Sequence, residues 1–335
     1  MSIDRWINQC HFGDCIEALR QMPDGIVQTC VTSPPYFGLR SYLPDGHINK
    51  TLEIGLESTP EAYIQRMVEV FREVKRVLKD DGTCWINIAD SYCANRSYQV
   101  NSTKGGKKHS ESQSVGGKGS VVPVNCKPKD LNGIPWLLAF ALRTDGWYLR
   151  QEIIWEKPNS MPESVTDRCT KSHEQIFLLS KSEQYYFDNI AIKEPATVLS
   201  FKSQNNHRSS RDSFKRENSK RSKDNPIHGQ SNVSHRSERV ESSWDTEMRN
   251  KRSVWSVNTR PYSGAHFAVF PPELIAPCIL AGSPVGGVVL DPFGGSGTTA
   301  QVAQDLGRQW ILCELNDAYQ HLQNVRTSQS SLALF

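Results

Sequence analysis

The segment Gly287–Ala300 constrains the fold more than any other part of this 335-residue chain. It reads GVVLDPFGGSGTTA: an apolar strand that ends at Asp291, a glycine-rich turn and the first turn of a helix. A second strand, Trp310–Glu314, ends 23 residues beyond Asp291, and only 21 residues follow it. That remainder is too short to complete a sheet, so the other strands must come from the N-terminal part of the chain. The sequence therefore predicts a permuted order, with this C-terminal unit in the middle of the sheet.

The rest of the chain alternates predicted strands and helices, which indicates an α/β fold with a mostly parallel sheet. N-terminal strands are expected to run up to Asp14 and to Ser33, beside the glycine-rich turn. Further strands are predicted at 26–31, 83–88, 147–155 and 175–180, and helices at 59–78, 132–144, 272–280 and 298–306. The clearest helix is the one at 59–78, because Thr59 and Pro60 are typical starting residues and its apolar residues have helical spacing.

The glycine-rich turn has the spacing of a nucleotide-binding loop. Glycines let a ligand lie against the backbone, and the helix that follows directs its N-terminus at the ligand. An acid at the end of the next strand, here Glu314, is placed to accept hydrogen bonds from ribose hydroxyls. The turn is not a P-loop, because no lysine follows the glycines. The alternative is a tight turn with a purely structural role.

The tetrapeptide Ser33-Pro34-Pro35-Tyr36 follows the strand at 26–31. Two prolines stiffen the loop and remove two amide donors, so it presents mainly acceptors: the Ser33 hydroxyl and the carbonyls of Ser33 and Pro34. An exocyclic amino group of a base offers two N–H donors that match these acceptors, and Tyr36 offers a flat face for stacking. The alternative is a turn built around a core tyrosine. No metal site is predicted.

Two basic segments interrupt the patterned chain. Residues 196–260 hold 14 Lys and Arg against seven Asp and Glu, and residues 96–128 hold six against one. They are either solvated loops or surfaces for nucleic-acid phosphates. The nine cysteines are scattered and the N-terminus lacks a secretory pattern, so we expect a cytoplasmic protein without disulfides and without a membrane partner.

These motifs, in this order, resemble the β group of DNA amino-methyltransferases. The resemblance implies a Rossmann-like fold with a seven-stranded, mostly parallel sheet and a circularly permuted motif order. It also implies S-adenosyl-L-methionine as cofactor and double-stranded DNA as substrate, with the N4 of cytosine or the N6 of adenine as the methylated atom. The residues implied for the target amino group are Ser33, Pro34, Pro35 and Tyr36. Those implied for the cofactor are Asp14, Phe267, Asp291, Pro292, Phe293, Gly295, Ser296, Gly297, Thr298 and Glu314.

The same resemblance divides the chain into three parts. Residues 1–195 form the catalytic half, with a mobile basic loop at 96–128, and residues 261–335 form the cofactor-binding half. Residues 196–260 form a basic target-recognition region. Its aromatic residues are expected in a small core, or alternatively stacked on displaced bases: Phe201, Phe214, Trp244 and Trp255.

Ser33 favours cytosine as the target base, because relatives that methylate adenine usually carry Asp or Asn at this place. Adenine N6 stays open as the alternative, and an NAD-dependent oxidoreductase or an inactive nucleic-acid-binding protein are more distant ones. His173 and Glu174 are expected to be a structural pair rather than acid–base groups, while Asp90 either faces the base or is a solvated strand-end acid. A cognate restriction endonuclease is a possible partner, and the oligomeric state is open.

Overall fold

The computed structural model describes residues 3–39, 41–93, 126–196, 247–260 and 270–328. The chain divides into two compact units, one made of Met1–Ala191 with Arg252–Phe335 and the other of Ile192–Lys251. In the second unit, β6 (Glu194–Pro195) pairs with β7 (Met248–Arg249). Most of both basic segments lies outside the described residues, as do Phe201, Phe214, Trp244 and Phe267.

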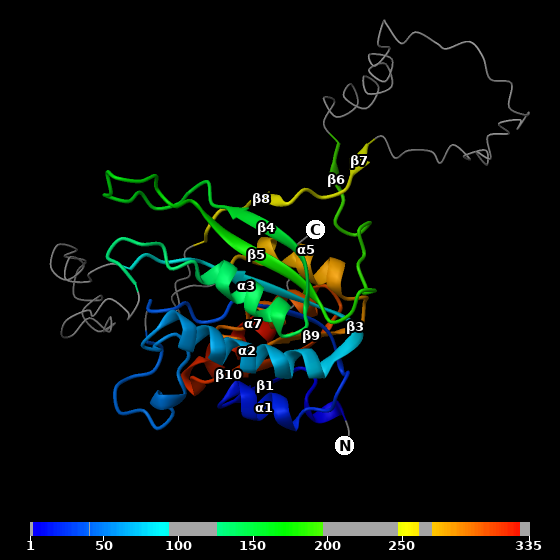
Figure 1. Cartoon of the computed structure of the whole chain (residues 1–335). Helices are drawn as coiled ribbons and strands as arrows, with labels where there is room; N and C mark the ends of the chain where they lie inside the picture. Colours follow the sequence, from blue (N-terminus) through cyan, green and yellow to red (C-terminus); the bar gives the residue numbers. More distant parts are fainter. Residues whose placement is uncertain (1–2, 40, 94–125, 197–246, 261–269, 329–335) are drawn as a thin grey trace, which may run out of the picture. The chain divides into compact units, whose positions relative to one another are not determined.

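The first unit contains an eight-stranded sheet in the order β1-β10-β9-β2-β3-β5-β4-β8 (Figure 1). Neighbouring strands are parallel except where β5 is inserted between β3 and β4. The strands are β1 (Gln9–Phe12), β2 (Val27–Thr32), β3 (Leu78–Ile88), β4 (Tyr148–Glu156), β5 (His173–Ser180), β8 (Val254–Ser256), β9 (Val288–Asp291) and β10 (Gln309–Glu314). The α/β class and the mostly parallel sheet are confirmed.

The strand order also confirms the permutation. β9 lies between β10 and β2, with Cys30 paired with Leu290. The N-terminal and C-terminal parts of the chain are therefore joined at the middle of one sheet. Since β2 and β9 are parallel, the loops that follow Thr32 and Asp291 leave the same edge of the sheet.

Two sets of helices pack against this sheet (Figure 1). In one set α2 (Pro60–Val77) contacts both α1 (Cys15–Gln21) and α3 (Ile134–Thr144). In the other, α6 (Thr298–Asp305) contacts both α5 (Pro272–Gly282) and α7 (Gln320–Ser328). Short 3-10 helices occur at Ile3–Arg5, Lys50–Leu52 and Asp317–Tyr319.

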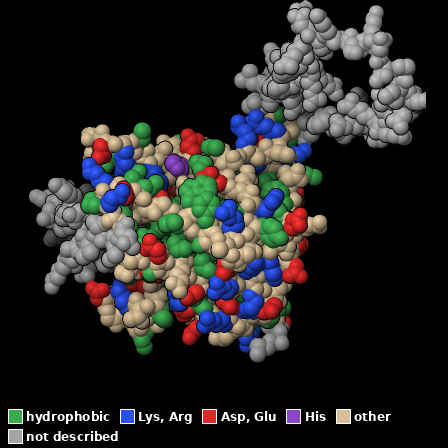
Figure 2. All heavy atoms as spheres, in the orientation of Figure 1, with side chains coloured by type: hydrophobic (Ala, Val, Ile, Leu, Met, Phe, Trp, Pro, Cys, Tyr) green, Lys and Arg blue, Asp and Glu red, His purple; other side chains and the backbone are tan. Residues whose placement is uncertain are grey.

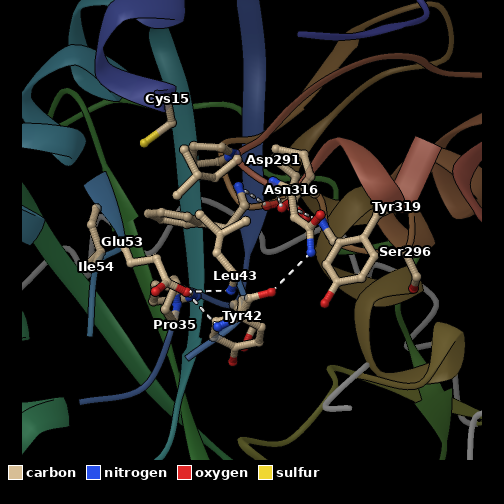
Figure 3. A pocket seen from close by; sticks show the side chains of 18 of the residues that line it. Cys15, Pro35, Tyr42, Leu43, Glu53, Ile54, Asp291, Ser296, Asn316 and Tyr319 are labelled. Atoms are coloured by element: carbon tan, nitrogen blue, oxygen red, sulfur yellow. Dashed lines mark hydrogen bonds between the residues drawn. The ribbon is translucent and has the colours of Figure 1, made fainter. Parts of the chain in front are cut away.

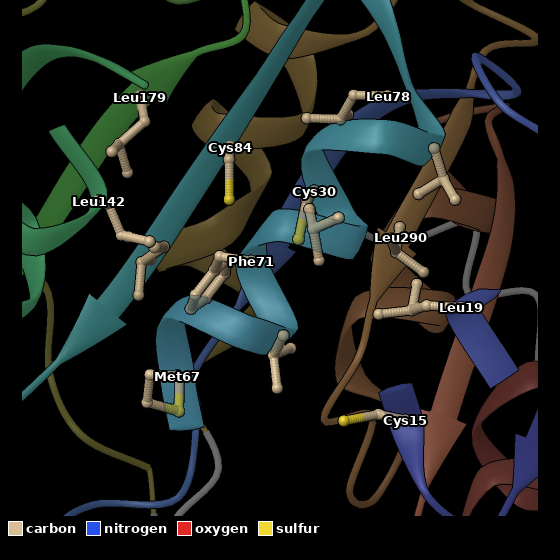
Figure 4. Close-up of a cluster of buried hydrophobic side chains, with 14 of the residues drawn as sticks. Cys15, Leu19, Cys30, Met67, Phe71, Leu78, Cys84, Leu142, Leu179 and Leu290 are labelled. Carbon is tan, nitrogen blue, oxygen red and sulfur yellow. The ribbon is translucent and has the colours of Figure 1, made fainter. Parts of the chain in front are cut away.

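The α2 helix anchors the main core (Figure 4). Thr59 caps its first turn by accepting a hydrogen bond from the Ala62 amide at 3.1 Å, as its sequence predicts. Its buried side chains recur every three or four residues: Tyr63, Met67, Val70, Phe71, Val74 and Val77. They belong to the same buried cluster as Cys30 and Cys84, on neighbouring strands. On α5, a Cβ added to Gly282 would meet Thr29 and Thr83, which precede those cysteines and so point to the opposite face of the sheet.

The structure corrects three expectations from the sequence. The sheet has eight strands rather than seven, because β8 pairs with β4. Trp255 is buried in β8 of the main sheet rather than in a separate recognition core. Residues 79–82, predicted as a turn, are part of β3, where a register shift against β2 accommodates them.

The surface in Figure 2 mixes acidic, basic and apolar side chains. On α3, Trp136, Leu137 and Phe140 remain 39–45% exposed. Among the described helices, none combines the length and the apolar character that a membrane crossing requires.

Candidate active site

A pocket lies at the edge of the sheet where β1, β2, β9 and β10 end. Ser33, Pro34, Pro35 and Tyr36, here named the acceptor loop, form one part of its lining. Residues 291–298 are here named the glycine turn. All of them except Gly297 form another part of the lining, together with Glu314. The structure thus brings together the two motifs that the sequence places at opposite ends of the chain.

Asp291 holds the glycine turn in shape. Its Oδ1 accepts hydrogen bonds from the Thr32 hydroxyl at 2.6 Å and the Phe293 amide at 3.0 Å, and its Oδ2 accepts one from the Thr299 hydroxyl at 2.7 Å. Burial outweighs these bonds and raises the pKa of Asp291 to about 6. Both oxygens are thus engaged inside the protein. Asp291 also lines the pocket, so the part in cofactor binding that the resemblance implies for it stays a prediction.

Glu314 closes the same turn from β10. Its Oε2 accepts a hydrogen bond from the Gly295 amide, and its Oε1 accepts one from the Asn316 amide, each at 2.8 Å. Burial, aided by the nearby Asp291 carboxylate, raises the pKa of Glu314 to about 7 against these two bonds. A carboxylate held this way retains lone pairs for hydroxyl donors in the pocket that it lines.

Two hydroxyls of the glycine turn have no hydrogen-bond partner among the residues that the structure describes. Ser296 Oγ and Thr298 Oγ1 are buried and make no hydrogen bond in the described part of the chain, and both residues line the pocket. Buried polar atoms normally have partners, so these two point to a polar ligand.

Gly297 has a different role from the one implied for it. It is absent from the pocket lining, and its positive φ of 86° starts α6. A Cβ at this position would approach the backbone of Gln323 to 3.2 Å. Gln323, which is 3% exposed, also donates from Nε2 to the Gly295 carbonyl at 2.8 Å. Gly297 therefore allows α7 to pack against the glycine turn.

Asp14 lies on the pocket wall and caps α1. Its Oδ1 accepts hydrogen bonds from the amides of Ile16 at 2.7 Å and Glu17 at 3.0 Å, and its Oδ2 pairs with Arg66 at 3.2 Å. Asp14 therefore caps α1 and also lines the pocket.

Residues 42–54, which the sequence analysis did not identify as part of a site, contribute to the pocket lining (Figure 3). The Glu53 carboxylate accepts hydrogen bonds from the backbone amides of Tyr42 and Leu43, and Asn316 Nδ2 donates to the Tyr42 carbonyl at 3.1 Å. Phe270 also lines the pocket, and the lining residues that the sequence missed include Cys15, Leu52, Ile54 and Tyr319. No motif or spacing marks them, because they reach the pocket only through the fold.

The acceptor loop is braced from two sides. The Pro35 carbonyl accepts a hydrogen bond from the Tyr63 hydroxyl of α2 at 2.8 Å. The Tyr36 hydroxyl donates to Glu174 Oε2 at 2.7 Å. Within the described residues no donor reaches the Pro34 carbonyl, so it stays available beside the Ser33 hydroxyl.

His173 and Glu174 differ in burial and in contacts. His173 is exposed, whereas Glu174 is 8% exposed and contacts Tyr36, Asn87 and Lys157. Asp90 is partly buried, and its carboxylate is engaged by the start of α3. It caps α3 by accepting hydrogen bonds from the amides of Gly133 at 3.0 Å and Ile134 at 3.2 Å.

An open α/β sheet with a glycine turn, a strand-end acid and a pocket at the carboxyl edge defines an enzyme class that binds nucleotide-like ligands. The sequence profile of a DNA methylase family, N6_N4_Mtase, matches residues 27–324. The chain belongs to this family. It is a DNA methyltransferase of the N4/N6 type.

Curated relatives include type II methyltransferases. M.XycI of Xanthomonas campestris pv. cyanopsidis and M.Cfr9I of Citrobacter freundii are each 44% identical over 308 residues, which cover 92% of this chain and 83% of each relative. M.SmaI of Serratia marcescens is 43% identical over 322 residues, which cover 94% of this chain and 88% of M.SmaI.

Two solved structures share the fold. The cytosine-N4-specific PvuII DNA methyltransferase aligns with a TM-score of 0.59 at 16% identity, covering 97% of this chain and 88% of its own. TTHA0409 of Thermus thermophilus, solved with S-adenosyl-L-methionine, aligns with a TM-score of 0.54 at 22% identity, covering 97% and 95%. These likenesses confirm the Rossmann-like methyltransferase fold.

Proposed function

We propose that this protein transfers a methyl group from S-adenosyl-L-methionine to the exocyclic N4 of cytosine in duplex DNA. The observation that carries the proposal is the shared pocket: the acceptor loop and the glycine turn line one cavity. A target amino group held at the first would face a cofactor bound at the second. An NAD-dependent oxidoreductase would leave the acceptor loop without a role.

The pocket residues fit this cofactor. The unpartnered hydroxyls of Ser296 and Thr298 suit the charged amino-acid end, and Glu314 suits ribose hydroxyls. Asp14, Pro292, Phe293 and Gly295 would complete the lining. When bound, the cofactor supplies an electrophilic methyl group on a sulfonium.

The acceptor loop prepares the nucleophile. A flipped base stacks on Tyr36 while the Ser33 hydroxyl and the Pro34 carbonyl accept its two amino hydrogens. These bonds favour a pyramidal nitrogen whose lone pair is withdrawn from the ring and aimed at the methyl carbon. Positioning and oriented acceptors therefore provide the acceleration, without a metal or a covalent intermediate.

Cytosine is favoured over adenine by Ser33, a neutral acceptor. A structural neighbour described as cytosine-N4-specific supports this choice. N6-methylation of adenine by the same pocket is the alternative. The basic segments at 96–128 and 196–260 would contact DNA phosphates, giving salt-sensitive binding in the cytoplasm. The type II methyltransferase names of the relatives support a cognate restriction endonuclease as partner.

The proposal is tested by incubating the full chain with plasmid DNA and methyl-labelled cofactor, then digesting the DNA to nucleosides. The expected product is N4-methylcytosine, and base-resolved sequencing of the product gives the recognition site. Label in N6-methyladenine would overturn the choice of base. Absence of label in plasmids that together present many sequence contexts would contradict the proposed activity.

Cofactor affinity should increase as the pH rises toward 7. Burial raises the pKa of Glu314 to about 7, so the ligand-free pocket binds a proton there below pH 7. Ribose hydroxyls donate to the ionised form, so binding must release that proton and strengthens by up to about tenfold per pH unit below the pKa. Titration calorimetry at several pH values should show this slope in the wild type and lose it in Glu314→Gln. An identical slope in that variant would assign the dependence to another group.

A further inference from the structure

Five side chains form a hydrogen-bonded line that starts in the acceptor loop and ends on the strands behind it. The Ser33 hydroxyl donates to the Tyr36 hydroxyl at 3.4 Å, and Tyr36 donates to Glu174 Oε2 at 2.7 Å. The other carboxylate oxygen, Oε1, forms an ion pair with the Lys157 ammonium. Asn87 Nδ2 also donates to Oε2 at 3.0 Å.

The chemistry of these groups fixes the direction of every bond in the line. The ammonium of Lys157 and the amide nitrogen of Asn87 can only donate, and a carboxylate can only accept. Tyr36 must then donate to Glu174. Burial, together with the Glu174 carboxylate, raises the pKa of Tyr36 above its usual value, so the hydroxyl keeps its proton. The tyrosine oxygen is left with lone pairs that accept the hydrogen of Ser33.

We propose that Glu174 is a positioning residue that makes Ser33 a hydrogen-bond acceptor for the target amino group. Through Tyr36 it draws the Ser33 hydrogen away from the pocket, so that the lone pairs of Ser33 Oγ face the substrate. The inference rests on the proposed function and deepens it, because it names the residue that sets the polarity of the acceptor loop. It applies to the amino group of either cytosine or adenine.

The position of Glu174 supports this role. The residue lies near the start of β5, a strand antiparallel to β3, and so reaches the edge of the sheet where the acceptor loop leaves β2. A carboxylate that is only 8% exposed is costly unless charges and donors compensate it, and Lys157 and Asn87 do so. Its Oε2 is the atom to which the Tyr36 hydroxyl donates.

Glu174→Gln tests the polarity with almost no change of shape. The Lys157 ammonium requires the amide oxygen of the new side chain, so the NH2 group must face Tyr36. Asn87 Oδ1 lies 3.5 Å from the Tyr36 hydroxyl and Asn87 Nδ2 faces Oε2, so Asn87 must turn its oxygen toward the new NH2 group. Tyr36 is then left without an acceptor on this side. It accepts the bond from the NH2 group and turns its own hydrogen toward Ser33, which loses a lone pair for the substrate. We expect the single-turnover methylation rate at saturating DNA and cofactor to fall about a hundredfold, the loss typical of one oriented catalytic hydrogen bond. Cofactor affinity and Tm should stay close to wild type.

A second substitution should restore the polarity. In Glu174→Gln combined with Lys157→Met, no ammonium competes for the amide oxygen, which can then face Tyr36 and Asn87. We expect the double variant to methylate at least about tenfold faster than Glu174→Gln alone, an energetic coupling that a purely structural role would not produce. Lys157→Met alone should lose less than Glu174→Gln, because the carboxylate still accepts from Tyr36. Tyr36→Phe, which breaks the line but keeps the ring, should lose about as much as Glu174→Gln.

The outcomes separate this inference from the proposed function. A wild-type protein that methylates DNA while Glu174→Gln keeps more than about a third of its rate would overturn the inference alone. A double variant no faster than Glu174→Gln would do the same. If Glu174→Gln has a much lower Tm, Tyr36→Phe decides: an unimpaired rate in that variant overturns the inference. A wild-type protein that labels no amino group in DNA contradicts the proposed function and, with it, this inference.

Discussion

Ser33→Ala should reduce the single-turnover rate of methyl transfer by about a hundred- to a thousandfold, the range expected when one oriented hydrogen-bond partner of a reacting group is lost. The substitution removes an acceptor for the target amino group and leaves the glycine turn intact. Cofactor affinity should therefore stay within about twofold of wild type. Rapid-quench methylation of a plasmid or of an oligonucleotide containing the recognised site measures the rate, and titration calorimetry measures the affinity.

Ser328→Ala is the matched control. That serine lies at the end of α7, is exposed and donates only to the Val325 carbonyl. It should leave both rate and affinity unchanged. A Ser33→Ala variant as active as this control would contradict the proposed role of the Ser33 hydroxyl as an acceptor for the target amino group. Equal losses of cofactor binding and rate would instead mean that the acceptor loop shapes the cofactor site.

Asp291→Ala should lower the free energy of unfolding by about 3 kcal/mol and weaken cofactor binding at least about tenfold. The carboxylate is 2% exposed and accepts hydrogen bonds from two buried threonine hydroxyls and one amide. Its removal leaves the Thr32 hydroxyl and the Phe293 amide without this acceptor, while the Thr299 hydroxyl keeps only the longer contact to the Val31 carbonyl at 3.5 Å. Each buried donor left unsatisfied costs roughly 1–3 kcal/mol. Thr32 lies at the end of β2, directly before the acceptor loop, whereas Phe293 and Thr299 belong to the C-terminal part of the chain. The substitution therefore removes bonds that hold the acceptor loop and the glycine turn together.

Asp80→Ala controls for the loss of an aspartate. The Asp80 side chain is 98% exposed and pairs only with Lys181 at the surface, at 3.2 Å, so its removal should change stability by less than about 0.5 kcal/mol. Urea unfolding measures both variants. An Asp291→Ala protein as stable as Asp80→Ala, with normal cofactor affinity, would contradict the role given to Asp291.

The backbone of the site could be predicted from the sequence because its signals are local. A glycine turn between an apolar strand and a helix places Gly295 and Ser296, and the acid at the end of the next strand places Glu314 beside them. Two prolines similarly mark the acceptor loop. In each case the chain within a few residues dictates the geometry, so one sequence suffices.

The rest of the site depends on contacts between distant segments. Glu174 reaches Tyr36 across 138 positions in the sequence, and Asn316 reaches Tyr42 across 274. A His–Glu dipeptide before a strand has no spacing that distinguishes a surface pair from a carboxylate facing a loop. Gln323 was missed for a related reason, because its contact with the Gly295 carbonyl joins positions 28 residues apart.

The proposed reaction requires the sulfur of the bound cofactor to lie next to the acceptor loop. A crystal structure of the full chain with S-adenosylhomocysteine measures this directly. We expect the product in the described pocket, its amino-acid end on the hydroxyls of Ser296 and Thr298, its ribose on Glu314, and its sulfur facing the Ser33–Tyr36 loop. A product bound elsewhere, or with its sulfur turned away from Ser33, would contradict it.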